Sequence, residues 1–273
     1  MSARTSTVIA LLTAASPAAA QVQVDLSRSG PAESWTLQES DRLFLISRQA
    51  ATMAPMTFRV GTVDSLQAVQ ALGSGFDAEV FGDLALLSWL QLGVSVDYGD
   101  VGDPSVQGLV APAVYAQAQI LRQATAGLDL AGAVNFKKYG FSSPTADRPN
   151  DGEVEGQVLL DRRWRRISLT ANGVFGKSIS VPDSDAEVKL GTGYYLLQNL
   201  LVGLDGIGRY DTSFDGGPQD GTRYWEVTGG PMLTWKISNV TVSGLAGVSA
   251  PMHAPAVGAT VGPIGMVQLG YSP

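Results

Sequence analysis

Residues 90–98 read LQLGVSVDY, and this stretch decides the fold class. Its first, third, fifth, seventh and ninth residues are apolar, and those between them are polar or glycine. A period of two residues predicts a β-strand with one apolar face. That face could point into a soluble barrel or outward to lipid, so the rest of the chain must decide between the two.

The same alternation recurs along most of the chain and predicts about twelve strands. Their lengths cluster near the roughly 9–11 residues that a tilted strand needs to cross a bilayer. The predicted strands cover residues 57–63, 75–84, 90–98, 110–120, 128–139, 154–160, 167–175, 187–196, 201–210, 223–234, 240–248 and 258–271.

The connections between these strands fall into two alternating classes. One class is short, and the other is longer and rich in Gly, Pro, Ser and Asp, as in GFSSPTADRPNDGE. Membrane barrels have tight turns at one end and long loops at the other, whereas a soluble meander has no reason to sort its loops this way. The short connections are residues 85–89, 121–127, 161–166, 197–200 and 235–239.

Composition and the amino terminus limit the function classes. The formal net charge of −7 argues against a nucleic-acid partner, because phosphate binding needs clustered Lys and Arg. The 273 residues include no Cys, which excludes thiolate chemistry and disulfides. Residues 1–20 combine a charge, an apolar run and small residues, and this order predicts a secretory signal peptide. Residues 21–56 then form a periplasmic tether, an extra pair of strands or a short plug, and residues 57–273 form the barrel.

Aromatic residues indicate which face meets lipid. Trp and Tyr gather at both bilayer interfaces, because their rings are apolar and their polar atoms seek water. Such residues stand at both ends of the predicted strands, which favours an apolar face turned toward lipid. The interface set is Trp89, Trp164 and Trp235 at the short turns, and Tyr98, Tyr139, Tyr210 and Trp225 near the long loops.

The alternation then assigns the opposite, polar face to the lumen. Acidic residues outnumber basic ones on this face, so the lumen is expected to favour cations. The charged lumen residues are Asp77, Glu79, Asp97, Asp129, Lys137, Glu155, Glu187, Lys189, Asp205, Arg209 and Glu226.

Over residues 57–271 the chain resembles the barrel-only outer-membrane proteins of Gram-negative bacteria. The resemblance rests on architecture, and it implies an all-β, transmembrane, antiparallel up-and-down barrel in the cell outer membrane. Its implied partners are outer-membrane lipid, the barrel-assembly machinery and small solutes. Such barrels usually end on an aromatic residue, whereas here Tyr271 is followed by Ser272 and Pro273.

No catalytic or metal site is expected. His253 lies in a predicted loop and has neither the His-x-Ser pattern of membrane-embedded phospholipases nor the nearby Asp of barrel proteases. The acidic clusters of the long loops lack calcium-loop spacing. The run DRRWRR at 161–166 is either a headgroup anchor or an ordinary solvated turn.

The expected function is a passive pore or facilitator for small solutes, without a cofactor. Small residues such as Gly93, Ser95 and Ala113 on the lumen face leave room for a passage. Large charged side chains paired across the barrel would instead fill it and make a structural or surface-contact protein. A soluble exported ligand-binding barrel, with its faces reversed, is the third alternative.

Overall fold

The computed structural model describes residues 37, 41–69, 73–100, 109–138, 152–179, 184–212, 223–253 and 261–273. All of them belong to one compact unit, Ser34–Pro273. The predicted signal peptide, residues 1–20, lies outside the described residues.

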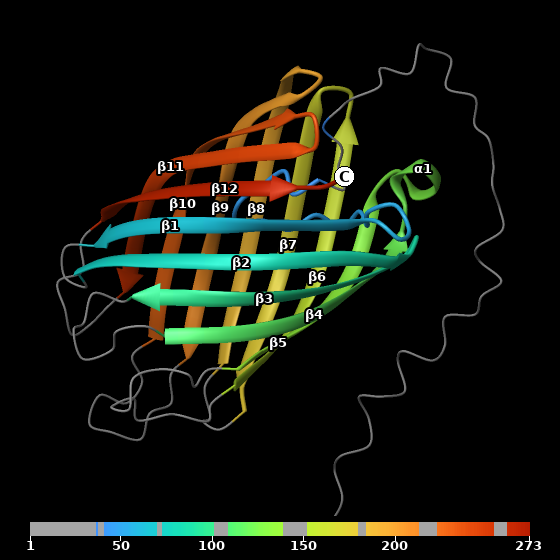
Figure 1. Cartoon of the computed structure of the whole chain (residues 1–273). Helices are drawn as coiled ribbons and strands as arrows, with labels where there is room; N and C mark the ends of the chain where they lie inside the picture. The colour runs from blue at the N-terminus through green and yellow to red at the C-terminus, as the bar shows by residue number, and fades with distance from the viewer. Residues whose placement is uncertain are drawn as a thin grey trace, which may run out of the picture. The chain divides into compact units, whose positions relative to one another are not determined.

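The described chain is a closed barrel of twelve antiparallel strands in sequential order (Figure 1). Strand β1 pairs with β2 on one side and with β12 on the other, so the sheet has no free edge. The strands are β1 (Phe58–Val69), β2 (Gly73–Leu87), β3 (Leu90–Asp100), β4 (Leu109–Leu121), β5 (Asp129–Lys138), β6 (Gly152–Trp164), β7 (Ile167–Ser178), β8 (Ser184–Leu197), β9 (Leu200–Thr212), β10 (Arg223–Ile237), β11 (Val240–His253) and β12 (Gly262–Tyr271).

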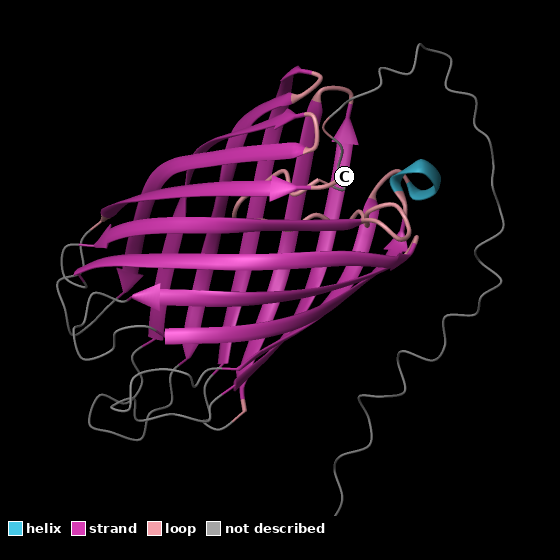
Figure 2. Ribbon diagram, viewed as in Figure 1, coloured by secondary structure: helices cyan, strands magenta, loops and turns pink. Residues whose placement is uncertain are grey.

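The turns at one end of the barrel are tight. Four of them have two residues, Ser88–Trp89, Arg165–Arg166, Gln198–Asn199 and Ser238–Asn239, and the fifth holds the short helix α1 (Gln123–Ala126), as Figure 2 shows. Arg165 and Ser238 take positive φ angles of 54° and 55°, which such narrow turns require. Among the described residues, no helix is long and apolar enough to span a membrane.

Two local predictions were wrong because strands run further than the alternation suggested. Strand β6 continues to Trp164, so Arg162 and Arg163 lie on a strand and only Arg165 and Arg166 form the turn. His253 is the last residue of β11, not a loop residue. In both cases backbone pairing with the neighbouring strand continues into residues of low β-propensity.

The two faces of the wall differ in the predicted way. On β3, Leu92, Val94 and Val96 are exposed on the outer face, whereas Gln91 is buried on the inner face. The same apolar exposure recurs on the outer face of the other strands and forms a belt that a water-soluble protein would have to bury. Further members of this belt are Val80, Val114, Val134, Val158, Leu169, Leu190, Leu204, Val227 and Val267.

The segment that precedes β1 lies inside the barrel. Residues 41–56, which we call the plug, contact inward-facing side chains of most strands through the hydrogen bonds described below. Figure 1 shows parts of this blue segment between the strands. Of the three structures left open for residues 21–56, the described part has that of a short plug.

Candidate functional site

Asp205 on β9 is the main anchor of the plug. The Ile46 N–H donates to its carboxylate at 2.6 Å, and the Ser47 hydroxyl donates at 2.7 Å. The Ser47 N–H lies 3.3 Å from the same group. Hydrogen bonds to an ionised, buried acceptor are stronger than neutral ones, so Asp205 holds this part of the plug firmly.

On β7 and β6, wall side chains bind the plug backbone at its next residues. The Asn172 side chain accepts from the Arg48 N–H and donates to the Arg48 carbonyl, both at 2.7 Å. These are the two backbone groups of Arg48 that a neighbouring strand would pair with in a sheet. Asp161 accepts from the Ala50 N–H. The plug therefore satisfies its backbone through wall side chains, without joining the sheet.

The remaining plug contacts extend the attachment around the wall. On β4, the Gln117 side chain donates to the carbonyls of Gln49 and Ala50, both at 3.1 Å. On β10 and β12, the Thr234 hydroxyl donates to the Leu43 carbonyl at 2.6 Å, and the Gln268 amide donates to the Arg42 carbonyl at 3.1 Å. Inner residues on opposite sides of the barrel are thereby removed from water: Gln117 is 1% exposed, Thr234 0% and Gln268 1%.

An apolar cluster fills the lumen on the β8–β12 side. Leu43, Phe44 and Leu45 of the plug are buried there with Leu37. Their wall neighbours in this cluster are Tyr195, Leu201, Met232, Leu245 and Ile264. Burial of a Leu or Phe side chain contributes about 1.5–3 kcal/mol, so this cluster stabilises the closed lumen as much as the hydrogen bonds do.

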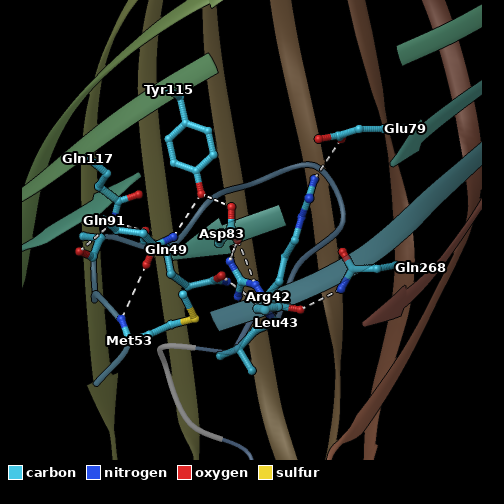
Figure 3. Close-up of polar contacts among 12 residues, drawn as sticks. Arg42, Leu43, Gln49, Met53, Glu79, Asp83, Gln91, Tyr115, Gln117 and Gln268 are labelled. Atoms are coloured by element: carbon cyan, nitrogen blue, oxygen red, sulfur yellow. Dashed lines mark hydrogen bonds and ion pairs between the residues drawn. The ribbon is translucent and has the colours of Figure 1, made fainter. Parts of the chain in front are cut away.

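A network that includes three arginines, Arg42, Arg48 and Arg59, occupies the other side of the plug. Figure 3 shows Arg42, Glu79, Asp83 and Tyr115 of this network. Arg42 pairs with Glu79 at 3.3 Å, and the Arg59 Nε donates to Asp83 at 2.9 Å. The Tyr115 hydroxyl also donates to Asp83. Arg48 stacks over the Tyr115 ring with its guanidinium carbon 4.0 Å from the centroid, an arrangement that favours a cation.

Arg48 stays charged in this setting. Burial acts to lower the pKa of its guanidinium, but the nearby Tyr115, Asp83, Glu79 and Glu155 together outweigh burial and raise that pKa above its ordinary value. The plug thus holds a fixed positive charge beside Tyr115 on the inner face of the wall.

A charged vestibule occupies the long-loop half of the lumen. Five of its charged residues each lie three positions from the long-loop end of their strand, and we call this set the vestibule ring: Asp97, Glu155, Glu187, Arg209 and Glu226. Arg209 donates to Glu187 at 2.6 Å, and Glu155 accepts from the wall amides of Asn135 and Gln157 at 3.2 and 3.0 Å.

The other basic residues of the vestibule also meet carboxylates. Lys137 pairs with Asp97 at 2.6 Å, and Lys189 pairs with Glu187 at 2.9 Å. Because each base is matched while carboxylates outnumber bases, the vestibule keeps a negative charge.

The structure places all eleven charged residues predicted for the lumen on the inner face, but not in one site. Asp77 and Glu79 lie with the vestibule ring, whereas Asp205 holds the plug. Asp129 closes the β4–β5 turn, where it accepts from the Gln119 amide at 2.7 Å and from the Gln123 N–H at 2.8 Å. Among the described residues, no group of three or more His, Asp or Glu is arranged to hold a metal ion.

Sequence reasoning missed several residues of the plug and of the wall around it. Asp83 has the same strand parity as Glu79, so the alternation could have found it. Asp161 was assigned to an Arg-rich turn and lies on β6 instead. Arg42 and Arg48 carry no sequence signal, because the plug has no regular period.

Five of the aromatic residues predicted for the interface are exposed, namely Trp89, Trp164, Trp235, Tyr98 and Trp225, and Tyr210 is half-buried. Trp89, Trp164 and Trp235 lie at the short-turn end, and Trp164 is 61% exposed. Near the long loops, the rings of Tyr210 and Trp225 contact each other with centroids 4.6 Å apart. Tyr98 is also exposed, and Tyr139 lies outside the described residues.

Comparisons with known proteins agree on the fold. No family model matches the chain, and no curated protein matches it. The barrel is similar to the solved structure of the KdgM porin, with a TM-score of 0.51 and 10% identity, over 79% of this chain and 99% of that one. The fold is that of an outer-membrane β-barrel. A second structure, "KdgM porin in complex with disordered oligogalacturonate", gives a TM-score of 0.52 and 9% identity, over 79% and 99%.

These findings confirm the predicted fold class and the resemblance to outer-membrane barrels. The exposed apolar belt is the physical reason for locating the chain in the cell outer membrane, as predicted, and for its contact with lipid.

A closed barrel should also be visible on a gel. We expect the detergent-folded chain to migrate faster when it is unheated than after boiling, because a barrel without edges resists detergent unfolding. When cells that produce the chain are fractionated, the chain should be recovered in the outer-membrane fraction. One unshifted band, with the chain in the soluble periplasmic fraction, would contradict this expectation.

Proposed function

We propose that the chain is a passive channel for small solutes, closed in this structure by its own plug. The observation that carries the proposal is the division of the lumen into a charged vestibule and a plug. Porin-type barrels keep polar interiors for water and solutes, which a permanently filled barrel does not need. The proposal includes export by the amino-terminal signal, insertion by the barrel-assembly machinery of a Gram-negative cell, and no catalytic step.

The way in which the plug is attached supports the idea that it can leave the lumen. Its hydrogen bonds to Asp205, Asn172 and Gln117 are made by wall side chains, and they can be exchanged for water one at a time. A strand of the sheet could not leave without opening the barrel. The plug can therefore be displaced while the twelve-stranded wall stays intact.

The vestibule supports a preference for cations. Of the predicted lumen charges, six carboxylates lie in the vestibule, compared with three bases: Asp77, Glu79, Asp97, Glu155, Glu187 and Glu226, and Lys137, Lys189 and Arg209. Rings of one sign raise the local concentration of the opposite ion. The oligogalacturonate of the KdgM complex carries carboxylates, which such a ring repels, so we do not extend that solute to this chain.

Ion selectivity tests the proposal. In a planar bilayer under a salt gradient, openings of the full-length barrel should reverse at a potential of cation-selective sign. The shift should shrink in Glu155→Gln and more in Asp97→Asn, because the latter leaves Lys137 without its carboxylate. Added salt should weaken the preference by screening.

The matched control is Asp64→Asn, which removes a carboxylate from the outer face of β1. Asp64 lies in register with the belt residue Val267, so its loss should leave the reversal potential unchanged. Anion selectivity of the wild type would refute the proposed lining.

A filled structural barrel is the second candidate, and the apolar cluster around Phe44 favours it. Its members shut one side of the lumen with a core like that of a globular protein. If neither the wild type nor a variant with a weakened plug conducts, the filled barrel is the better account.

A further inference from the structure

A small cavity lies within the arginine network of the plug. Arg42, Arg48 and Arg59 line it together with Asp83 and Gln49, and its volume is about 10 Å³. This is near the smallest space that holds one water molecule. The cavity therefore has room for a single small species.

Two of the lining residues carry polar atoms that lack a bond. The Nη1 of Arg48 and the Nε2 of Gln49 are buried, and neither has a hydrogen-bond partner among the described residues. The side-chain Oε1 of Gln49 already accepts from the Leu43 N–H at 3.3 Å, which leaves the Nε2 of the same amide without a partner. Both atoms are donors, so both need an acceptor.

The guanidiniums around the cavity are not all held in ion pairs. Arg42 pairs with Glu79, and Arg59 with Asp83, whereas Arg48 forms no ion pair with a described residue. Glu79, Asp83 and Glu155 favour the charged form of Arg48 without lying within ion-pair distance of it. Three guanidiniums and one carboxylate therefore line the cavity, and one of these guanidiniums has no contacting carboxylate among the described residues.

We propose that this cavity binds one small monovalent inorganic anion, with chloride as its simplest example. A single anion would accept from the donors of Arg48 and Gln49 and give Arg48 the contacting negative charge that it lacks. Water could accept the same bonds without supplying that charge. Chloride is larger than water, so the flexible Arg42 and Arg48 side chains must shift slightly to admit it. Arg48 and Arg42 are only partly buried, so the ion can reach the cavity without unfolding of the wall.

Thermal unfolding measures this binding in the full-length barrel. At constant ionic strength, the midpoint at which the fast-migrating gel species disappears should be about 2–4 °C higher in chloride than in gluconate. The rise should saturate with chloride concentration, as a single site requires. Gluconate is the reference because it is too large for the cavity.

The variants separate this site from general salt effects. Arg48→Gln should lose the difference between chloride and gluconate, while Arg162→Gln, on the outer face of β6, should keep it. Should Arg48→Gln fail to fold, Gln49→Leu keeps the charge and removes one donor, and should need several-fold more chloride for the same midpoint. Bromide should also give an anomalous scattering peak at the cavity in crystals.

Three results would overturn the proposal. One is an equal midpoint for the wild type in chloride and gluconate, which would assign the cavity to water. Another is an undiminished chloride effect in both Arg48→Gln and Gln49→Leu. The third is a bromide peak elsewhere in the lumen with none at Arg48.

Discussion

Replacing Asp205 with alanine should raise the open probability of the barrel in a planar bilayer by about ten- to a hundred-fold. The carboxylate accepts from Ile46 and Ser47, and its loss leaves those plug donors unsatisfied only while the plug is seated. Bonds to a charged group contribute about 1.5–3 kcal/mol each, and about 1.4 kcal/mol changes an equilibrium tenfold. Single-channel recording measures the change directly.

A second anchor and a matched control make the test specific. Asn172→Ala removes both bonds to the Arg48 backbone and should open the barrel to a smaller extent, because the lost partner is neutral. Glu226→Ala removes a lumen carboxylate that contacts Thr228 and Ser249 of the wall, and should leave the open probability near that of the wild type. A rise in Asp205→Ala and Glu226→Ala, with none in Asn172→Ala, would mean that lost lumen charge, not release of the plug, opens the channel.

Val94→Arg should destabilise the folded barrel by about 2–4 kcal/mol, while Ser95→Arg should cost much less. Val94 is 59% exposed on the lipid face of β3, so an arginine there must enter the hydrocarbon. Ser95 has the opposite parity and faces the lumen beside Asp97. Urea unfolding in lipid vesicles, followed by the gel shift, gives both values.

The pair tests which face meets lipid without depending on function. Both variants add the same charged side chain to adjacent residues of one strand, so the added charge is the same in both. Equal destabilisation would place both faces in similar surroundings, and a larger cost at Ser95 would reverse the assignment.

The wall could be predicted from sequence because its determinants are local. Residues 90–98 show the period of two without reference to any other segment, and Trp89 and Tyr98 mark the two interfaces. The misplaced ends have a local cause as well. Alternation fades at Arg162 and Arg163, where the strand is held by pairing with β7.

The plug could not be predicted because its determinants are distant. The Gln268–Arg42 bond joins residues 226 positions apart, and the Thr234–Leu43 bond joins residues 191 apart. Both use a plug carbonyl, which every residue possesses, so sequence gives no signal for them. Sequence gives no signal for the contacts of Arg48 either, because its backbone binds Asn172 and its side chain stacks on Tyr115, both far away in the chain.

The plug is tethered at the short-turn end on both of its sides. The Leu37 N–H donates to the carbonyl of Gln198, and the Met56 N–H donates to that of Ala85, both near short turns. A segment that enters and leaves by the same mouth can withdraw only through that mouth. In the proposed channel, pressure from the vestibule side would therefore move the plug out through the short-turn mouth, and pressure from the other side would press it further into the lumen.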